Sequence, residues 1–130
     1  MFRRLILLAV VAAAIPATVS AQSAGGAAPS LAGEWTVDLS AKPDELYTKP
    51  MRLVLNPDGT VSGSFYESEI GSGRWKTDRG RTCASFRTSD GVGPYHSSAC
   101  LVGDRVEGQT WAEQRNFLFN WNATRNTGDK

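Results

Sequence analysis

The sequence has few of the residues that build metal centres and nucleic-acid interfaces. It contains one histidine and two cysteines among 130 residues, too few for a zinc site if the cysteines pair with each other. Its formal charge is only +1, so it lacks the excess of basic side chains that nucleic acid requires. We therefore expect no metal, no other cofactor and no nucleic-acid partner.

Long apolar runs and helical periodicity are also scarce. The longest run, from Leu5 to Ile15, is shorter than the ~18–20 residues of a membrane-spanning helix. From Gly33 onward, apolar residues nowhere keep the 3.6-residue period of a helix for about ten residues. We expect a mature chain without a membrane span, without helical backbone beyond residue 60 and with a single domain.

The N-terminus has the three-part layout of a secretory signal. Arg3 and Arg4 precede the apolar run, and Val19-Ser20-Ala21 forms a small-residue cleavage site. We expect residues 1–21 to be a signal peptide and the mature protein to be periplasmic or secreted. Such a compartment permits disulfides.

The rest of the chain divides into three parts. Residues 22–30 carry small side chains and predict a flexible N-terminal arm, and residues 127–130 form a short C-terminal tail. Residues 31–126 alternate apolar and polar side chains between turn signals about 8–12 residues apart, which is typical of antiparallel strands. The apolar rows predict eight strands, containing Trp35–Leu39, Met51–Leu55, Val61–Phe65, Gly73–Trp75, Thr82–Thr88, Tyr95–Leu101, Val106–Thr110 and Phe117–Ala123.

The hairpins can be tested for register, because directly paired residues must point to the same face. In three successive hairpins, the apolar residues that pair across the turn all point to one face of the sheet. The turns near residue 91, at 102–105 and at 112–115 give the pairs Cys83–Cys100, Leu101–Val106 and Thr110–Phe117.

The first of these pairs places the two cysteines opposite each other on the outer face. A disulfide between Cys83 and Cys100 is then geometrically reasonable, and it would stabilise the fold by ~3 kcal/mol in the chain-entropy model. The alternative is two free thiols on a strand surface.

These strands predict an all-β fold, a single eight-stranded antiparallel up-and-down (meander) β-barrel. Closure removes exposed edges, and eight strands leave an interior just wide enough for side chains or one small ligand. Tight turns at 56–59, 78–80 and 102–105 fall at one end. The opposite end, which we predict to be the mouth, receives the longer connections at 40–49, 67–72, 89–94 and 112–115.

The candidate ligand contacts are inward positions near this mouth. Four carry hydroxyl groups, which need partners such as ordered water or a polar ligand when buried: Thr88, Tyr95, Ser97 and Thr110. The aromatic residues Phe65, Trp75 and Phe86 lie below them and are either core or an apolar ligand wall.

The only histidine, His96, is the one candidate general base. Its predicted neighbour across the hairpin is Arg87, and a solvated strand residue is the simpler interpretation. The sequence has no Gly-x-Ser-x-Gly motif and no phosphate-binding loop. We therefore expect that the protein is not an enzyme.

The first predicted strand, with Gly33-Glu34-Trp35, resembles the opening strand of the calycins, the lipocalin and avidin superfamily. In that family a tryptophan at this position lies under an arginine of the last strand, and Arg125 stands where that partner would be. The resemblance implies a cation–π contact between Trp35 and Arg125 that closes the barrel floor.

Short islands of residues 31–125 resemble avidins in particular, among them Gly63-Ser64-Phe65 and Gly73-Arg74-Trp75. By this resemblance Trp111 is a second pocket tryptophan, although strand alternation turns it outward unless a bulge precedes it. Val37 and Phe65 replace polar side chains that contact biotin in avidins. Tight biotin binding is therefore disfavoured.

The function that we expect is non-catalytic binding of a small molecule at the mouth. The alternative is a protein-binding module, because Leu31-Ala32-Gly33-Glu34-Trp35 also resembles exported bacterial inhibitors of metalloproteases, whose N-terminal arm enters the protease. The arm would then bind an exported hydrolase. An oligomer is also possible, through the outward side chains of Trp111 and Leu118.

Overall fold

The computed structural model describes residues 30–126 and, within the predicted signal peptide, residues 12 and 14. The rest of the signal peptide, residues 22–29 of the arm and the tail at 127–130 lie outside the described residues. In the described part, no helix is long and apolar enough to cross a membrane.

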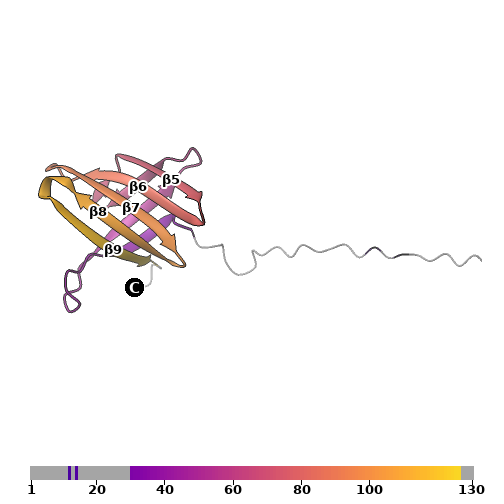
Figure 1. The fold of residues 1–130 in the computed structure, drawn as a ribbon, viewed down its shortest axis with the longest axis horizontal. Helices are drawn as coiled ribbons and strands as arrows, with labels where there is room; N and C mark the ends of the chain where they lie inside the picture. Colours follow the sequence, from indigo (N-terminus) through magenta and orange to yellow (C-terminus); the bar gives the residue numbers. More distant parts are fainter. Residues whose placement is uncertain (1–11, 13, 15–29, 127–130) are drawn as a thin grey trace, which may run out of the picture.

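Antiparallel strands that follow one another along the chain make up the fold, so the predicted all-β meander is confirmed. They form one sheet in the order β4-β3-β2-β1-β9-β8-β7-β6-β5, which curls into a half-barrel (Figure 1). The strands are β1 (Gly33–Asp38), β2 (Thr48–Leu55), β3 (Val61–Phe65), β4 (Ser68–Glu69), β5 (Ser72–Asp78), β6 (Arg81–Ser89), β7 (Pro94–Val102), β8 (Arg105–Ala112) and β9 (Phe117–Arg125).

The structure has nine strands in its described part, so the prediction of eight is wrong by one. The additional strand, β4, lies in the segment that we expected to be a loop. Tyr66 and Glu67 adopt left-handed backbone conformations, with φ of 52° and 64°, and reverse the chain so that Ser68 pairs with Phe65. Two successive left-handed residues form the tight turn that matches the twist of a hairpin.

The predicted register is confirmed in two hairpins and wrong in the third. Cys83 faces Cys100 and Leu101 faces Val106, but Thr110 faces Phe119 instead of Phe117. The cause is a 3₁₀ turn, η1 (Glu113–Arg115), which ends at Asn116 with φ of 51°. This turn lengthens the connection, and it also contradicts our expectation of no helical backbone beyond residue 60.

The corrected register places Gly108 opposite Trp121. The indole ring lies so close to this glycine that an added Cβ would be 2.3 Å from its ring carbons. Only glycine fits at residue 108. Because this position has no side chain, the Trp121 ring can lie across β8 in the core. Its Nε1 donates a hydrogen bond to Oγ1 of Thr110 at 2.9 Å.

Arg125 joins the first and last strands, as the resemblance to calycins predicted. Its guanidinium carbon lies 3.9 Å from the centroid of the fully buried Trp35 ring. Nη1 donates to the carbonyl of Ala32 at 2.7 Å, and Nη2 donates to the carbonyl of Ser30. Gly33, with φ of 121°, leaves the space, because a Cβ there would lie 2.5 Å from Nη1 of Arg125.

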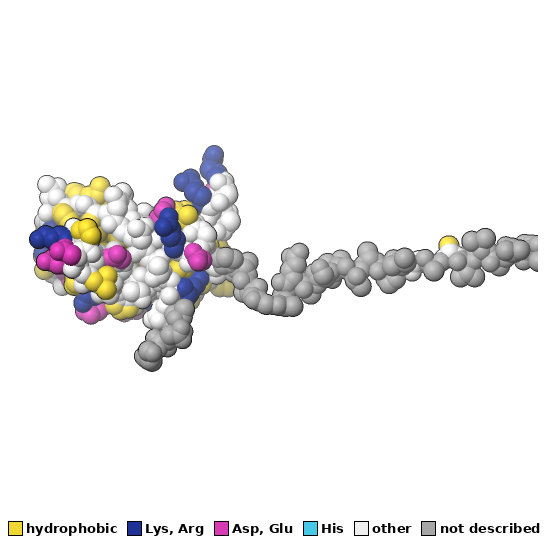
Figure 2. All heavy atoms as spheres, turned by 90° about the horizontal axis from the view of Figure 1, so that it is seen from below, with side chains coloured by type: hydrophobic (Ala, Val, Ile, Leu, Met, Phe, Trp, Pro, Cys, Tyr) yellow, Lys and Arg dark blue, Asp and Glu magenta, His cyan; other side chains and the backbone are white. Residues whose placement is uncertain are grey.

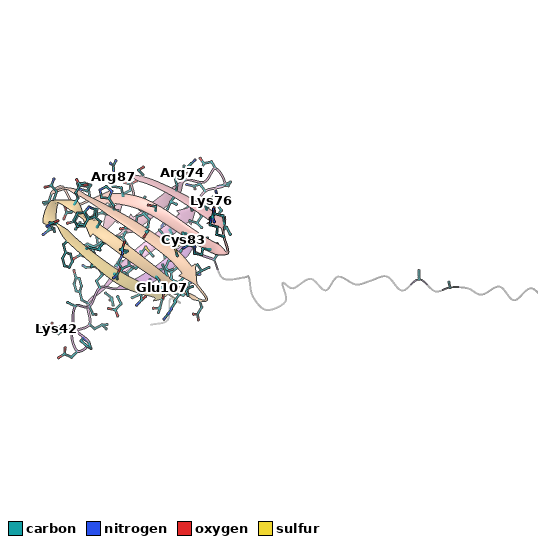
Figure 3. The ribbon with its side chains drawn as sticks, viewed as in Figure 1. Lys42, Arg74, Lys76, Cys83, Arg87 and Glu107 are labelled. Atoms are coloured by element: carbon teal, nitrogen blue, oxygen red, sulfur yellow. A yellow bond between two sulfur atoms is a disulfide. The ribbon has the colours of Figure 1, made fainter. Side chains whose placement is uncertain are left out.

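The predicted disulfide between Cys83 and Cys100 is present on the outer face of β6 and β7 (Figure 3). The inner face holds the hydrophobic core, in which the largest fully buried side chains include Trp35, Leu31, Met51 and Leu53. The strands thus alternate one packed face with one solvated face, as their sequence pattern predicts.

Replacing Arg125 by lysine tests the link between β1 and β9. Lysine keeps the charge but loses the planar group that stacks on Trp35 and bonds two carbonyls at once. We expect the free energy of unfolding to fall by about 1–3 kcal/mol in urea denaturation. Arg105→Lys, at an exposed ion pair with Glu107, is the control and should change it by no more than about 0.5 kcal/mol. Equal effects of both substitutions would contradict this role of Arg125.

Gly108→Ala tests the corrected register of β8 and β9. The added methyl group would collide with the Trp121 ring, so we expect a loss of about 1–3 kcal/mol in the free energy of unfolding. The control is Gly71→Ala, because a Cβ there meets no atom within 4 Å. If Gly108→Ala is as stable as the wild type, Trp121 does not lie over residue 108.

Candidate ligand-binding site

A cavity of about 580 Å³ opens at the end of the sheet that carries the longer connections. This volume lies within the range of about 300–1,000 Å³ typical of small-molecule sites. The loop with Lys42 extends away from the sheet at this end, whereas Arg74 and Lys76 lie on the other side of the molecule (Figure 3). The cavity therefore occupies the predicted mouth.

Apolar side chains from strands far apart in sequence form most of the cavity wall. Phe65 of β3 is buried, and its ring centroid lies 5.2 Å from that of Trp121 and 5.7 Å from that of Phe86. Phe117 and Phe119 of β9 stack on each other with centroids 5.5 Å apart. The apolar lining residues are Leu39, Ala41, Phe65, Ala112, Phe117 and Phe119.

Two buried threonines, Thr88 and Thr110, add hydroxyl groups to the lining. Oγ1 of Thr110 accepts a hydrogen bond from Trp121 and lies 2.8 Å from Oγ of Ser97. Ser97 does not itself line the cavity. The register of β7, β8 and β9 thus sets the position of the Thr110 hydroxyl, because each partner belongs to a neighbouring strand.

One side of the rim carries a hydrogen-bonded group of Asp90, Tyr95 and Arg115. The Tyr95 hydroxyl donates to Oδ2 of Asp90 at 2.6 Å, and Nε of Arg115 donates to the Tyr95 oxygen at 2.9 Å. The hydrogen bond from Tyr95 lowers the pKa of Asp90, and that from the Val92 amide acts in the same direction. The contact with Tyr95 raises the pKa of Arg115. Both charged groups therefore stay ionised over the physiological range.

The 3₁₀ turn brings Arg115 to this group. Gln114, in the same turn, packs against Gly93 in the loop after β6, where a Cβ would lie 1.8 Å from its side chain. This contact holds η1 against the loop that carries Asp90. Nη2 of Arg115 then lies 3.4 Å from Oδ2 of Asp90.

The other side of the rim carries Tyr47 and Tyr66, whose hydroxyl groups are hydrogen-bonded to each other. Lys49 forms an ion pair with Glu67 at 3.2 Å and lies 5.6 Å and 5.2 Å from the Tyr47 and Tyr66 ring centroids. The hydrogen bond with Tyr47, followed by burial, raises the pKa of Tyr66 to about 12. A left-handed backbone costs non-glycine residues such as Tyr66 and Glu67 free energy, and such strain is concentrated at functional sites.

The structure brings together some of the predicted contacts and separates others. Phe65, Thr88, Tyr95 and Thr110 line the cavity, and Phe86 and Ser97 are buried next to lining residues. Trp75 lies elsewhere, since its Nε1 donates to the Asn56 carbonyl in the turn after β2. Trp111 points outward, 37% exposed and paired with His96 and Leu118.

Much of the rim could not be predicted from the sequence. Its residues lie in connections between strands, where the alternation of apolar and polar residues does not predict which way a side chain points. They are Tyr47, Tyr66, Asp90 and Arg115. Asp90 and Arg115 meet only because η1 packs on the loop after β6. Phe117 and Phe119, by contrast, were recognisable as inward from their spacing, and only their register was wrong.

The single histidine of the sequence, His96, lies outside the cavity lining. Nε2 of His96 lies 3.2 Å from Glu113, and neither residue is among those that line the cavity. Among the described residues no group of three histidine, cysteine, aspartate or glutamate side chains is placed to hold a metal ion.

Comparison with family models, curated proteins and solved structures gave no significant match for this chain. The function must therefore be argued from its own residues.

The Tyr47–Tyr66 contact makes a testable prediction about pH. A raised pKa means that the folded state holds the Tyr66 proton more tightly than the unfolded state. Its stabilisation is complete below pH 10.0 and is lost as the pH rises towards 12. In Tyr47→Phe we expect Tyr66 to ionise closer to pH 10.0, measured by tyrosinate absorbance. Thr82→Val, which removes an exposed hydroxyl that is hydrogen-bonded to Thr77, is the control. Unchanged ionisation in Tyr47→Phe would refute the contact.

Proposed function

We propose that this chain is an exported, calycin-like barrel that binds one small molecule at its mouth without catalysis. The observation that carries this proposal is the cavity among the long connections, walled by aromatic rings and supplied with buried threonine hydroxyls. Ligand sites in proteins have this composition, an apolar wall with a few placed polar groups.

Contacts across the open side of the sheet support barrel closure. The amide of Trp75 donates to the carbonyl of Gly59 at 2.9 Å, and Thr60 forms an isolated bridge with Arg74. Gly73 packs so closely that a Cβ there would lie 3.0 Å from that of Val61. These contacts join β5 to the β2–β3 hairpin, so a barrel with a short seam fits the packing. The disulfide is compatible with export.

The resemblance to avidins argues against biotin as the ligand. Val37 is fully buried and Phe65 is nearly so, and both are apolar where avidins place hydrogen-bonding groups. Of the two, Phe65 lines the cavity, and a polar ligand group beside it would be left without a partner. The wall instead favours a molecule that presents ring or alkyl surface to Phe65, Phe117 and Phe119.

The alternative function is binding of an exported hydrolase through the N-terminal arm. Arg125 holds the carbonyl of Ser30, at the end of this arm, beside Trp35. This anchor is distinct from the cavity wall, so the two functions can be separated experimentally. Removal of residues 22–29 from the mature protein would abolish binding of a hydrolase but leave small-molecule binding intact.

Small-molecule binding can be tested with the fluorescent probe N-phenyl-1-naphthylamine. We expect its emission to rise on binding and Ala112→Phe to weaken binding at least about tenfold, because Ala112 is a buried lining residue and a larger side chain would fill the cavity. Trp111→Ala, next along β8 but outward, is the matched control and should bind as the wild type does.

Two results would contradict the proposal. One is the absence of probe binding to the wild-type protein. The other is a loss of binding in Trp111→Ala but not in Ala112→Phe, which would place the probe on the outer face. Circular dichroism of both variants checks that the sheet remains folded.

A further inference from the structure

We infer that the cavity selects an uncharged ring compound and rejects a charged molecule of the same shape. This inference rests on the proposed small-molecule binding and specifies the chemical class of the ligand. Asp90, Tyr95 and Arg115 are the residues that set the preference.

The charges in the cavity wall cancel. Among the described lining residues, Asp90 and Arg115 are the charged ones, and they lie 3.4 Å apart. Tyr95 bridges them, since it donates to Asp90 and accepts from Arg115. Each charge thus already has a partner of opposite sign, so the pair adds no net charge to the cavity wall.

The nearby cation on the opposite side of the rim is also paired. Lys49 bonds the carboxylate of Glu67 at 3.2 Å and lies close to the rings of Tyr47 and Tyr66. Its side chain is only 23% exposed. An anionic ligand that approaches Lys49 or Arg115 would therefore also approach the carboxylate paired with that cation.

Besides the Asp90–Arg115 pair, most polar groups in the cavity wall are uncharged hydroxyls, some of which are already hydrogen-bonded within the protein. Thr88 and Thr110 lie in the wall, and Ser68, Tyr47 and Tyr66 lie towards the β4 side. Hydroxyl groups both donate and accept hydrogen bonds, so they suit a ligand hydroxyl or carbonyl. The pKa of Tyr66, raised to about 12, keeps that phenol protonated at physiological pH.

The cost of desolvation turns this arrangement into selectivity. The transfer of a charge from water to an apolar site without a partner is unfavourable by several kcal/mol. The burial of a neutral ring is favourable. The rings of Phe65, Phe117 and Phe119 offer contact surface to such a ring, and aromatic pairs add to the gain. A neutral aromatic compound therefore matches both the wall and its polar groups.

The test uses three naphthalene derivatives that differ in charge: 2-naphthalenemethanol, 2-naphthoate and 2-naphthylmethylammonium. Calorimetric titration of the mature wild-type protein at neutral pH should give the neutral alcohol the lowest dissociation constant, by at least about tenfold, equivalent to about 1.4 kcal/mol. Equal or tighter binding of either ion overturns the inference.

Variants identify the residues responsible. Asp90→Asn leaves Arg115 without its counter-charge, so we expect the preference to shift towards the naphthoate anion. Arg115→Gln leaves Asp90 unbalanced and should shift it towards the ammonium ion. Arg105→Gln, at an exposed ion pair outside the cavity lining, is the control and should leave the three affinities in their wild-type order.

The outcomes separate this inference from the proposed function. If N-phenyl-1-naphthylamine does not bind, the proposed function fails and the inference fails with it. If that probe binds but an ion binds as well as the alcohol, the inference alone fails. If the wild type prefers the alcohol but neither variant moves the preference, the assignment to Asp90 and Arg115 is overturned.

Discussion

The stacking of Arg125 on Trp35 is the contact on which the architecture depends. It joins the last strand to the first, and the same guanidinium bonds two carbonyl groups of the segment that leads into β1. With β1 fixed between β2 and β9, the two halves of the meander form one continuous sheet that curls into a half-barrel. Its inner face becomes concave, and the core and the cavity both lie on that face.

The shape of the cavity depends more on turns than on strands. The left-handed pair Tyr66–Glu67 creates β4 and brings Tyr66 to the rim. Because of the 3₁₀ turn, Thr110 pairs with Phe119 and not with the predicted Phe117. The same turn places Arg115 beside Asp90. A change of two residues in one hairpin thus alters which side chains surround the cavity, although it leaves every inward residue inward, because the side-chain period is two.

The two sides of the mouth carry different ion pairs, but on both sides the charges cancel. Asp90 and Arg115 cancel through Tyr95, and Lys49 and Glu67 cancel beside a pair of tyrosines. Hydrophobic side chains, including Leu46, Phe117 and Leu118, remain exposed among charged ones, and Figure 2 shows such a mixture at one end of the molecule. The exposed Leu118 pairs with Trp111 on the outer face, where our expectation of an oligomer contact remains a prediction.

The amino-acid sequence predicts the fold class, the inward and outward faces of the strands, the Cys83–Cys100 pair and the contact of Trp35 with Arg125. The first three follow from local alternation and from turns whose length the residues specify, whereas the Trp35–Arg125 contact was predicted from the resemblance to calycins. Three features emerge only in the folded molecule: the β8–β9 register, the ninth strand and the rim of Tyr66, Asp90 and Arg115. Those features depend on how loops pack on one another, as Gln114 does on Gly93, and no local period encodes such contacts.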